Sequence, residues 1–589
     1  MTDSPSRTGP AAEPDPPADA DAEAEAKGEA EAGAEAEGEA GAEAGAGAGA
    51  QAQAEPRDAV EPSSAARTRA HGEHHQGAAP RPAPARQYRE PWQQWQPRRE
   101  PAAWQAEVRP EPPARIRTAT LWSSLATALL SALLLREGLG LNLLFVAVPA
   151  ALAAFFAARA AGRLPRPWTL VWAGGGLVLL AVPALRDAGL PVFLAVVSAV
   201  ALGALALHGS RTWPGVLLGP VGLVGAVGPG AVWALRGLRE RAGGTRGRVV
   251  PVLRALAVAA VLLVVFGTLF ASADAAFAEL LGSLIPDVSD SGAPSQLLLF
   301  GFGLCGALAA AHTAASPPRW DRVTVRPGKA RGRTEWALPL IVLNLLFAAF
   351  IAVQLVVLLG GYDRVVAETG LTPAQYARQG FWQLLWVTLL VLVVIVAAGR
   401  WAPRGGARDA ALVRTVLGTL CVLTLVVVAA ALRRMDLYVE AFGLTRLRVS
   451  VTAVELWLGL VIVLMLVAGA TRGRWLPRAV AASAGAAVLA FGLVSPDALV
   501  AERNVQRYER THKIDIEYFR ELSADAVPAL DRLPEPLRSC ALRGIADGLE
   551  PGDEPWYATS LAESRARDLL AERGVRSDVT CPGENRYRW

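Results

Sequence analysis

Residues 380–399 read Gly-Phe-Trp-Gln-Leu-Leu-Trp-Val-Thr-Leu-Leu-Val-Leu-Val-Val-Ile-Val-Ala-Ala-Gly, without a single charged side chain. About 20 apolar residues are enough for an α-helix to cross the hydrocarbon core of a bilayer. The sequence therefore predicts an all-α polytopic membrane protein with about 11 transmembrane helices. The other ten stretches of this kind are 118–135, 138–158, 168–185, 189–207, 250–272, 295–315, 335–360, 411–432, 452–470 and 477–494.

The segment 213–235 is also apolar, but Pro214, Pro220, Pro229 and several glycines interrupt it. Irregular backbone at membrane depth must be sheltered by protein or water. If the segment does not cross and the N-terminus is cytoplasmic, the cytoplasmic loops hold 22 Lys and Arg residues and the outer loops hold eight. Because cytoplasmic loops carry an excess of basic residues, we expect this topology. The segment then lines a substrate path or connects helices at the interface.

Composition divides the chain into three parts. Residues 1–117, rich in Ala, Glu, Gly and Pro, have too little apolar surface to fold and are expected to form a disordered cytoplasmic tail. Residues 118–495 form the transmembrane bundle, and residues 496–589 form a small helical domain on the extracytoplasmic side. The parts carry net charges of −8, +16 and −4. The total of +4 therefore describes no single surface, and nucleic-acid binding is not indicated.

The C-terminal part holds the two cysteines outside the predicted spans, Cys540 and Cys581. Disulfides persist in oxidising compartments, so an extracytoplasmic position would allow these two residues to pair. Helical periodicity also predicts a last helix over 555–573, with Trp556, Leu561 and Leu569 directed inward.

Polar residues in or beside the spans are the candidates for function, because charge in a membrane is costly. Most of them fall at the predicted outer ends of helices, whereas Glu455 lies about one turn inside the span 452–470. Two interpretations stay open. The charges cap helix ends and pair with one another, or they form one outward-facing polar site. The candidates are Asp274, Glu279, Tyr376, Arg378, Arg434, Asp436, Tyr438, Glu440, Arg446, Arg448 and Glu455.

Familiar catalytic motifs are absent from the sequence. The glycine-rich stretch 219–230 lacks the Lys-Ser/Thr ending of a phosphate-binding loop. No His-Glu-x-x-His or Cys-x-x-Cys occurs, so neither a metal site nor a cofactor is expected. An enzymatic activity is therefore the less favoured interpretation.

Several blocks of the sequence stand in a familiar order. They include Phe270-Ala-Ser-Ala-Asp-Ala-Ala-Phe277, Tyr376-Ala-Arg-Gln-Gly-Phe381, Arg434-Met-Asp-Leu-Tyr438, Gly443-Leu-Thr-Arg-Leu-Arg448, Asn504 to Tyr508, Ile514-Asp515 with Tyr518, and Leu522-Ser-Ala-Asp-Ala-Val-Pro528. Over roughly residues 118–535 the chain resembles the bacterial integral-membrane family called domain of unknown function 4173, close to the 4153 family. The resemblance implies an uncharacterised membrane protein and brings no catalytic residues with it. The Ala-, Arg- and Gly-rich composition is typical of a high-GC actinobacterium.

Two classes of function agree with these features in a multi-pass plasma-membrane protein. One is an envelope sensor or scaffold, whose extracytoplasmic domain binds a protein or a cell-wall component. The other is a transporter or lipid-handling protein with an outward-facing polar site. Beyond the lipid bilayer, the sequence specifies neither a partner nor an oligomeric state.

Overall fold

The computed structural model of the chain describes residues 110–241, 293–323, 328–360, 381–471, 473–549 and 555–581, with Val108 and isolated positions between 258 and 277. Within these ranges the regular elements are all helices. Nearly all of the predicted disordered tail, and most of the predicted span 250–272, lie outside the described residues.

One group of helices is built around α12 and uses small side chains for close packing. α12 packs against both α3 and α4, and α5 packs against α7. A Cβ added at Gly303 of α12 would come within 2.4 Å of Ser131 Oγ on α3, so only glycine permits this approach. The bounds are α3 (Thr118–Leu134), α4 (Asn142–Ala160), α5 (Pro167–Leu179), α6 (Val182–Leu185), α7 (Gly189–His208) and α12 (Ala293–Ala315).

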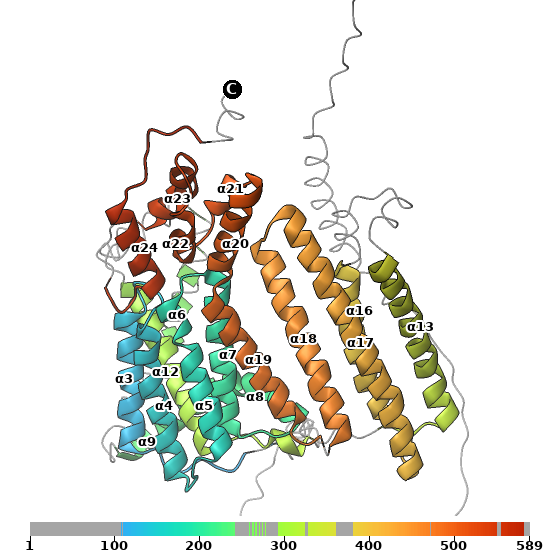
Figure 1. The fold of residues 1–589 in the computed structure, drawn as a ribbon. Coiled ribbons are helices and arrows are strands. Elements are labelled where there is room, and N and C mark those ends of the chain that lie inside the picture. The colour runs from blue at the N-terminus through green and yellow to red at the C-terminus, as the bar shows by residue number, and fades with distance from the viewer. Residues whose placement is uncertain are drawn as a thin grey trace, which may run out of the picture. The chain divides into compact units, whose positions relative to one another are not determined.

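A second group centres on α17, which packs against α13, α16 and α18. Its core is made of branched and aromatic side chains such as Phe381, Leu420 and Ile462. α19 packs against α18 and also against α7, and thereby links this group to the first one. Figure 1 shows the helices, which are α13 (Arg333–Gly360), α16 (Phe381–Trp401), α17 (Ala407–Phe442), α18 (Arg446–Ala470) and α19 (Leu476–Val494).

The membrane character predicted from the sequence is confirmed. Among the described residues, nine helices are long and apolar enough to cross a bilayer, or ten if the bent pair α8–α9 is one span. α3 has 17 residues and is shorter than this limit. α17 has 36 residues and, at about 1.5 Å per residue, is longer than the hydrocarbon core is thick.

The proline- and glycine-rich segment forms α8 (Trp213–Gly225) and α9 (Val227–Arg241), which meet at an angle of 50°. At the start of α8, the Asp321 carboxylate accepts a hydrogen bond from Thr212 N at 3.0 Å. At the end of α9, Arg241 donates to the carbonyl of Ile116. The stretches around Ile116 and Asp321 are themselves joined, because Ser316 donates to the carbonyl of Glu111. Both ends of the bent pair therefore lie at the same end of the neighbouring helices.

The C-terminal helices pack around a core that includes Val505, Phe519, Leu530 and Leu542. Arg538 is fully buried within this domain, where its Nε donates to Asp531 at 2.7 Å. The elements, drawn in red in Figure 1, are α20 (Pro496–Thr511), α21 (Ile516–Phe519), η3 (Ala524–Ala526), α22 (Val527–Leu530), α23 (Leu537–Gly548) and α24 (Leu561–Glu572).

A disulfide of 2.04 Å joins Cys540 to Cys581, the two residues for which the sequence predicts a pair. The cysteines are 41 residues apart. Closing a loop of this size removes unfolded-chain entropy worth about 4 kcal/mol, so the bond holds the end of the chain on the domain core.

The last helix differs from its prediction. It begins at Leu561 instead of residue 555, because Ser560 and Glu563 form a reciprocal capping box. Trp556 and Leu561 are exposed, not directed inward, whereas Leu569 packs against the domain core. Trp556 instead meets Phe145 of α4 edge to face, with ring centroids 6.2 Å apart. Helical periodicity alone failed here because the residues before Ser560 are not helical.

Candidate functional site

The turn between α17 and α18 is the first point at which the C-terminal domain meets the bundle. Asn504 of α20 accepts from Leu444 N at 2.9 Å and donates to Leu444 O at 2.7 Å. The adjacent Gly443 has a φ of 83°, and a Cβ there would lie 2.8 Å from Asn504 Oδ1. The turn therefore requires glycine at this position. The Asn504 side chain pairs with both backbone groups of Leu444, as a residue of a neighbouring β-strand would.

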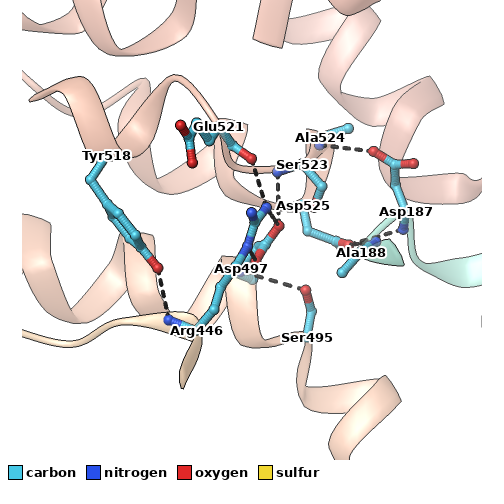
Figure 2. Close-up of polar contacts among 11 residues, drawn as sticks. Asp187, Ala188, Arg446, Ser495, Asp497, Tyr518, Glu521, Ser523, Ala524 and Asp525 are labelled. Atoms are coloured by element: carbon cyan, nitrogen blue, oxygen red, sulfur yellow. Dashed lines mark hydrogen bonds and ion pairs between the residues drawn. The ribbon is translucent and has the colours of Figure 1, made fainter. Parts of the chain in front are cut away.

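Arg446, the first residue of α18, binds the C-terminal domain through a bidentate ion pair (Figure 2). Its Nε and Nη2 donate to Asp497 Oδ1 and Oδ2, each at 2.6 Å. The same Nη2 donates to the carbonyl of Glu521 at 2.7 Å, and Arg446 N donates to Tyr518 Oη at 2.8 Å. The Asp497 side chain is 2% exposed. Planar guanidinium and carboxylate groups match in this geometry, so the contact fixes orientation as well as distance.

A second buried carboxylate, Asp525, docks the domain on the turn between α6 and α7. Its Oδ2 accepts from Asp187 N at 2.9 Å and from Ala188 N at 3.2 Å. Its Oδ1 lies 3.2 Å from Arg186 Nη1. In return, Asp187 Oδ2 accepts from Ala524 N at 3.1 Å. The two segments thus exchange backbone-to-carboxylate hydrogen bonds in both directions.

Burial affects the pKa of Asp497 and the pKa of Asp187 differently. At Asp497, burial acts to raise the pKa, but hydrogen bonds from Arg446 and Ser523 outweigh it and the pKa is lowered. At Asp187, burial dominates over the hydrogen bond from Ala524 N, with repulsion from neighbouring carboxylates added, and raises the pKa to about 6. The Arg446–Asp497 contact therefore remains an ion pair at neutral pH, whereas the Asp187 carboxyl gains or loses its charge in mildly acidic solution.

A groove of about 900 Å³ opens beside this junction, between α17, α18, α19 and α20. Its walls are mainly apolar and include Leu456, Trp457 and Phe491, with a row of alanines on α19. The end beside the C-terminal domain is charged. The charged residues at this end are Arg433, Asp436 and Glu440 of α17 and Arg503 of α20, and within the described chain none of the four makes a hydrogen bond or ion pair.

The structure brings together only some of the residues predicted to form one polar site. Arg446 belongs to the docking contact. Arg448 lies over the ring of Tyr438, 4.0 Å from its centroid, and donates to the carbonyl of Gly443. Asp436 and Glu440 line the groove. Arg434 lies on the same stretch of α17 and is half-buried.

Glu455 lies elsewhere, on the side of α18 that faces α16. It is fully buried and its Oε1 accepts from Thr388 Oγ1 at 3.1 Å, while Oε2 has no hydrogen-bond partner among the described residues. α18 begins at Arg446, so Glu455 lies more than two turns from the start of the helix. Asp274 is exposed and its Oδ1 accepts from Phe277 N at 3.3 Å. Glu279, Tyr376 and Arg378 lie outside the described residues.

The partners of Arg446 and of the α6–α7 turn were not among the sequence candidates. Asp497, Asp525 and Asn504 look like ordinary surface residues in the sequence, because nothing local shows that they are buried. A signal was present, since Asn504 and Asp525 fall within the blocks that carry the family resemblance. Asp497 follows Ser495-Pro496, a helix start at which an acidic residue is common.

The described ranges contain no cluster of three or more His, Cys, Asp or Glu side chains placed to hold a metal. The fold is that of a polytopic helical membrane protein with a helical C-terminal domain docked on its helix ends. A family model described as domain of unknown function DUF4153 matches residues 173–533. The chain therefore belongs to the DUF4153 family, named above as the neighbour of 4173. No curated protein and no solved structure matches it.

We expect Asp497→Asn to weaken docking of the domain by about 3 kcal/mol, because Arg446 would lose its carboxylate partner. Hydrogen exchange at residues 522–527 measures the loss. Glu502→Gln is the matched control on α20, because its ion pair with Arg532 is exposed and should contribute under about 1 kcal/mol. Equal effects of the two substitutions would show that the Arg446 contact does not hold the domain.

A second expectation concerns pH. A carboxyl whose pKa is about 6 in the folded protein and 3.8 as a free side chain favours folding when protonated. Docking stability should therefore fall as the pH rises from about 4 to about 6, and level off above that. Asp497 acts in the opposite direction and only below about pH 4.

Asp187→Asn should remove this pH dependence. Thermal unfolding of the purified protein between pH 4.5 and 7.5 measures it. An unfolding temperature with the same pH profile in both proteins would rule out Asp187 as the titrating group.

Proposed function

We propose that this protein binds a membrane lipid in the groove between α18 and α19 and presents the headgroup to the C-terminal domain. The observation that carries the proposal is the groove itself, which has mainly apolar walls and, at one end, charged side chains that make no ion pair with the described residues. This is the lipid-handling class of function that the sequence leaves open.

The walls of the groove fit an acyl chain. Ser483, Ala486, Ala487 and Ala490 recur on one face of α19, and their small side chains leave space that Leu or Val would fill. At about 900 Å³ the groove lies within the range of ligand-binding sites. It is bounded by helices long enough to span a bilayer, so a lipid can enter sideways without crossing water.

The outer end of the groove fits a headgroup that carries both charges. Arg433 and Arg503 can bind a phosphate, and Asp436 and Glu440 can bind an ammonium group. Three of these residues, at positions 433, 436 and 440, recur at helical spacing on α17. A zwitterionic phospholipid satisfies this arrangement better than a purely anionic one.

The proposal places the C-terminal domain outside the cell and the groove in the outer half of the bilayer. The turns that contact this domain carry few basic residues, whereas those at the opposite helix ends carry many, which supports a cytoplasmic position for the latter. The two ends of the bent pair α8–α9 meet this second, basic end, which favours a segment that re-enters without crossing.

Labelling of single cysteines in intact cells tests this orientation. Glu509→Cys, on the exposed face of α20, should react with a membrane-impermeant maleimide in intact cells. Arg474→Cys, in the exposed turn between α18 and α19, should react only after lysis. The reverse pattern would place the C-terminal domain in the cytoplasm.

Lipid binding is tested by native mass spectrometry of the delipidated protein with phosphatidylethanolamine or phosphatidylglycerol. We expect phosphatidylethanolamine to bind more tightly. Ala487→Trp should abolish binding because it fills the groove, whereas Ala151→Trp, exposed on α4 and outside the groove, should not. Arg503→Gln should lower the affinity several-fold, and Arg510→Gln on the same helix should leave it unchanged. Equal binding by Ala487→Trp and the unsubstituted protein would contradict the proposal.

A sensor or scaffold role is the second candidate, and the docking contacts favour it. The domain is fixed to α18 through Asp497 and to the α6–α7 turn through Asp525. A ligand that pulled on the domain would therefore act on two helix groups at once.

A further inference from the structure

A second hollow, of about 560 Å³, lies at the opposite helix ends and has a different character. It is bounded by the turn after α4, the turn after α7 and the residues that follow α12. Five arginines and two carboxylates line it. The arginines are Arg163, Arg166, Arg211, Arg319 and Arg322, and the carboxylates are Glu111 and Asp321.

Both carboxylates of the hollow already accept hydrogen bonds from groups of the protein itself. Asp321 accepts from Thr212 Oγ1 at 2.8 Å, and from Thr212 N and Arg211 N at 3.0 and 2.9 Å, so it caps the start of α8. Glu111 pairs with Arg319. Five guanidinium groups against two carboxylates leave the hollow with an excess of positive charge.

Three guanidinium groups, those of Arg166, Arg211 and Arg322, make no hydrogen bond or ion pair with any described residue. Each is exposed at the rim of the hollow, where an incoming ligand can reach it. Arg163 is half-buried and donates to the carbonyl of Ala314 at 2.7 Å. Burial lowers the pKa of Arg163, and the charge of Arg166 adds to the effect. An anion bound between them would relieve this repulsion.

Two further features favour an anion at the same place. α5 begins next to Arg166, and no side chain caps its N-terminus. The first residue, Pro167, has no N–H and Thr169 N donates to the carbonyl of Arg166, so α5 offers an anion mainly the positive end of its helix dipole. Basic pockets between transmembrane helices on the cytoplasmic side also bind lipid headgroups.

His208 indicates which kind of anion the hollow can bind. Its Nδ1 lies 2.8 Å from the carbonyl of Ala204, which can only accept, so Nδ1 carries the proton. The buried Nε2 has no partner among the described residues and is left as an acceptor, and His208 is one of the residues that line the hollow. A ligand that suits this wall needs anionic oxygens for the arginines and one O–H for the histidine. A phosphate monoester or inorganic phosphate has both, whereas a phosphodiester has no O–H.

The geometry points to a binding site for a phosphate monoester group at the helix ends opposite the C-terminal domain. Arg166, Arg211 and Arg322 bind the group, and His208 accepts a hydrogen bond from its O–H. The group is carried by free phosphate or by the headgroup of phosphatidate. This site is separate from the groove between α18 and α19 and does not depend on it.

The test uses the full chain at constant ionic strength. Calorimetry in detergent with sodium phosphate measures the free anion, and nanodiscs containing phosphatidate or phosphatidylmethanol, an anionic phosphodiester without an O–H, measure the lipid. The double substitution Arg166→Gln with Arg211→Gln should weaken binding at least tenfold. Because both side chains are exposed and without described partners, the protein should keep its unfolding temperature. Arg408→Gln, an exposed arginine outside the hollow, is the control and should change nothing.

The outcomes separate the sources of the ligand. Binding of phosphate in detergent that the double substitution abolishes supports a free-phosphate site. Binding that appears only with phosphatidate and is lost in the double variant supports a lipid site. His208→Phe should bring the affinity for phosphatidate down to that for phosphatidylmethanol. The proposal is overturned if phosphatidylmethanol binds as tightly as phosphatidate, or if Arg408→Gln weakens binding as much as the double substitution.

Discussion

The position of the C-terminal domain depends on the cost of keeping two carboxylates, Asp497 and Asp525, away from water. A buried charge without a partner costs several kcal/mol, so each needs a donor at a fixed place. Arg446 provides the donor for Asp497, and the backbone of the α6–α7 turn provides it for Asp525. Because the two donors stand on different helix groups, the domain can satisfy both carboxylates in only one orientation.

That orientation also shapes the groove. α20 is held across the ends of α18 and α19, and its Arg503 therefore stands at the charged end of a lipid-sized space. The two ends of the helices differ in how far acidic groups balance the basic ones. Near the domain, basic groups are neutralised within the protein or balanced by acidic ones, as Arg446 is by Asp497. At the opposite end, guanidinium groups outnumber carboxylates and remain available to ligands.

The sequence was most informative where one physical requirement dominates. Hydrophobic length alone located ten of the eleven predicted spans on helices, and the eleventh lies mostly outside the described residues. Arg446 and Arg448 were candidates because charge beside a span is conspicuous. Asp497, the partner of Arg446, was not a candidate, since burial arises only when segments far apart in the sequence meet. Glu455 was grouped with the outer residues, although the side of α18 it occupies faces α16, and periodicity does not assign that neighbour.

The contact between the first helical hairpin and the last loop has a consequence for how the protein is made. Asn142 N donates to the carbonyl of Tyr557 at 3.0 Å, and Gly140 has no room for a side chain beside Tyr557 and Ala558. The turn after α3 therefore leaves the ribosome long before its partner is synthesised. Until Tyr557 is made, water takes the place of this hydrogen-bond partner. A chain that stops before residue 557 would leave the turn exposed.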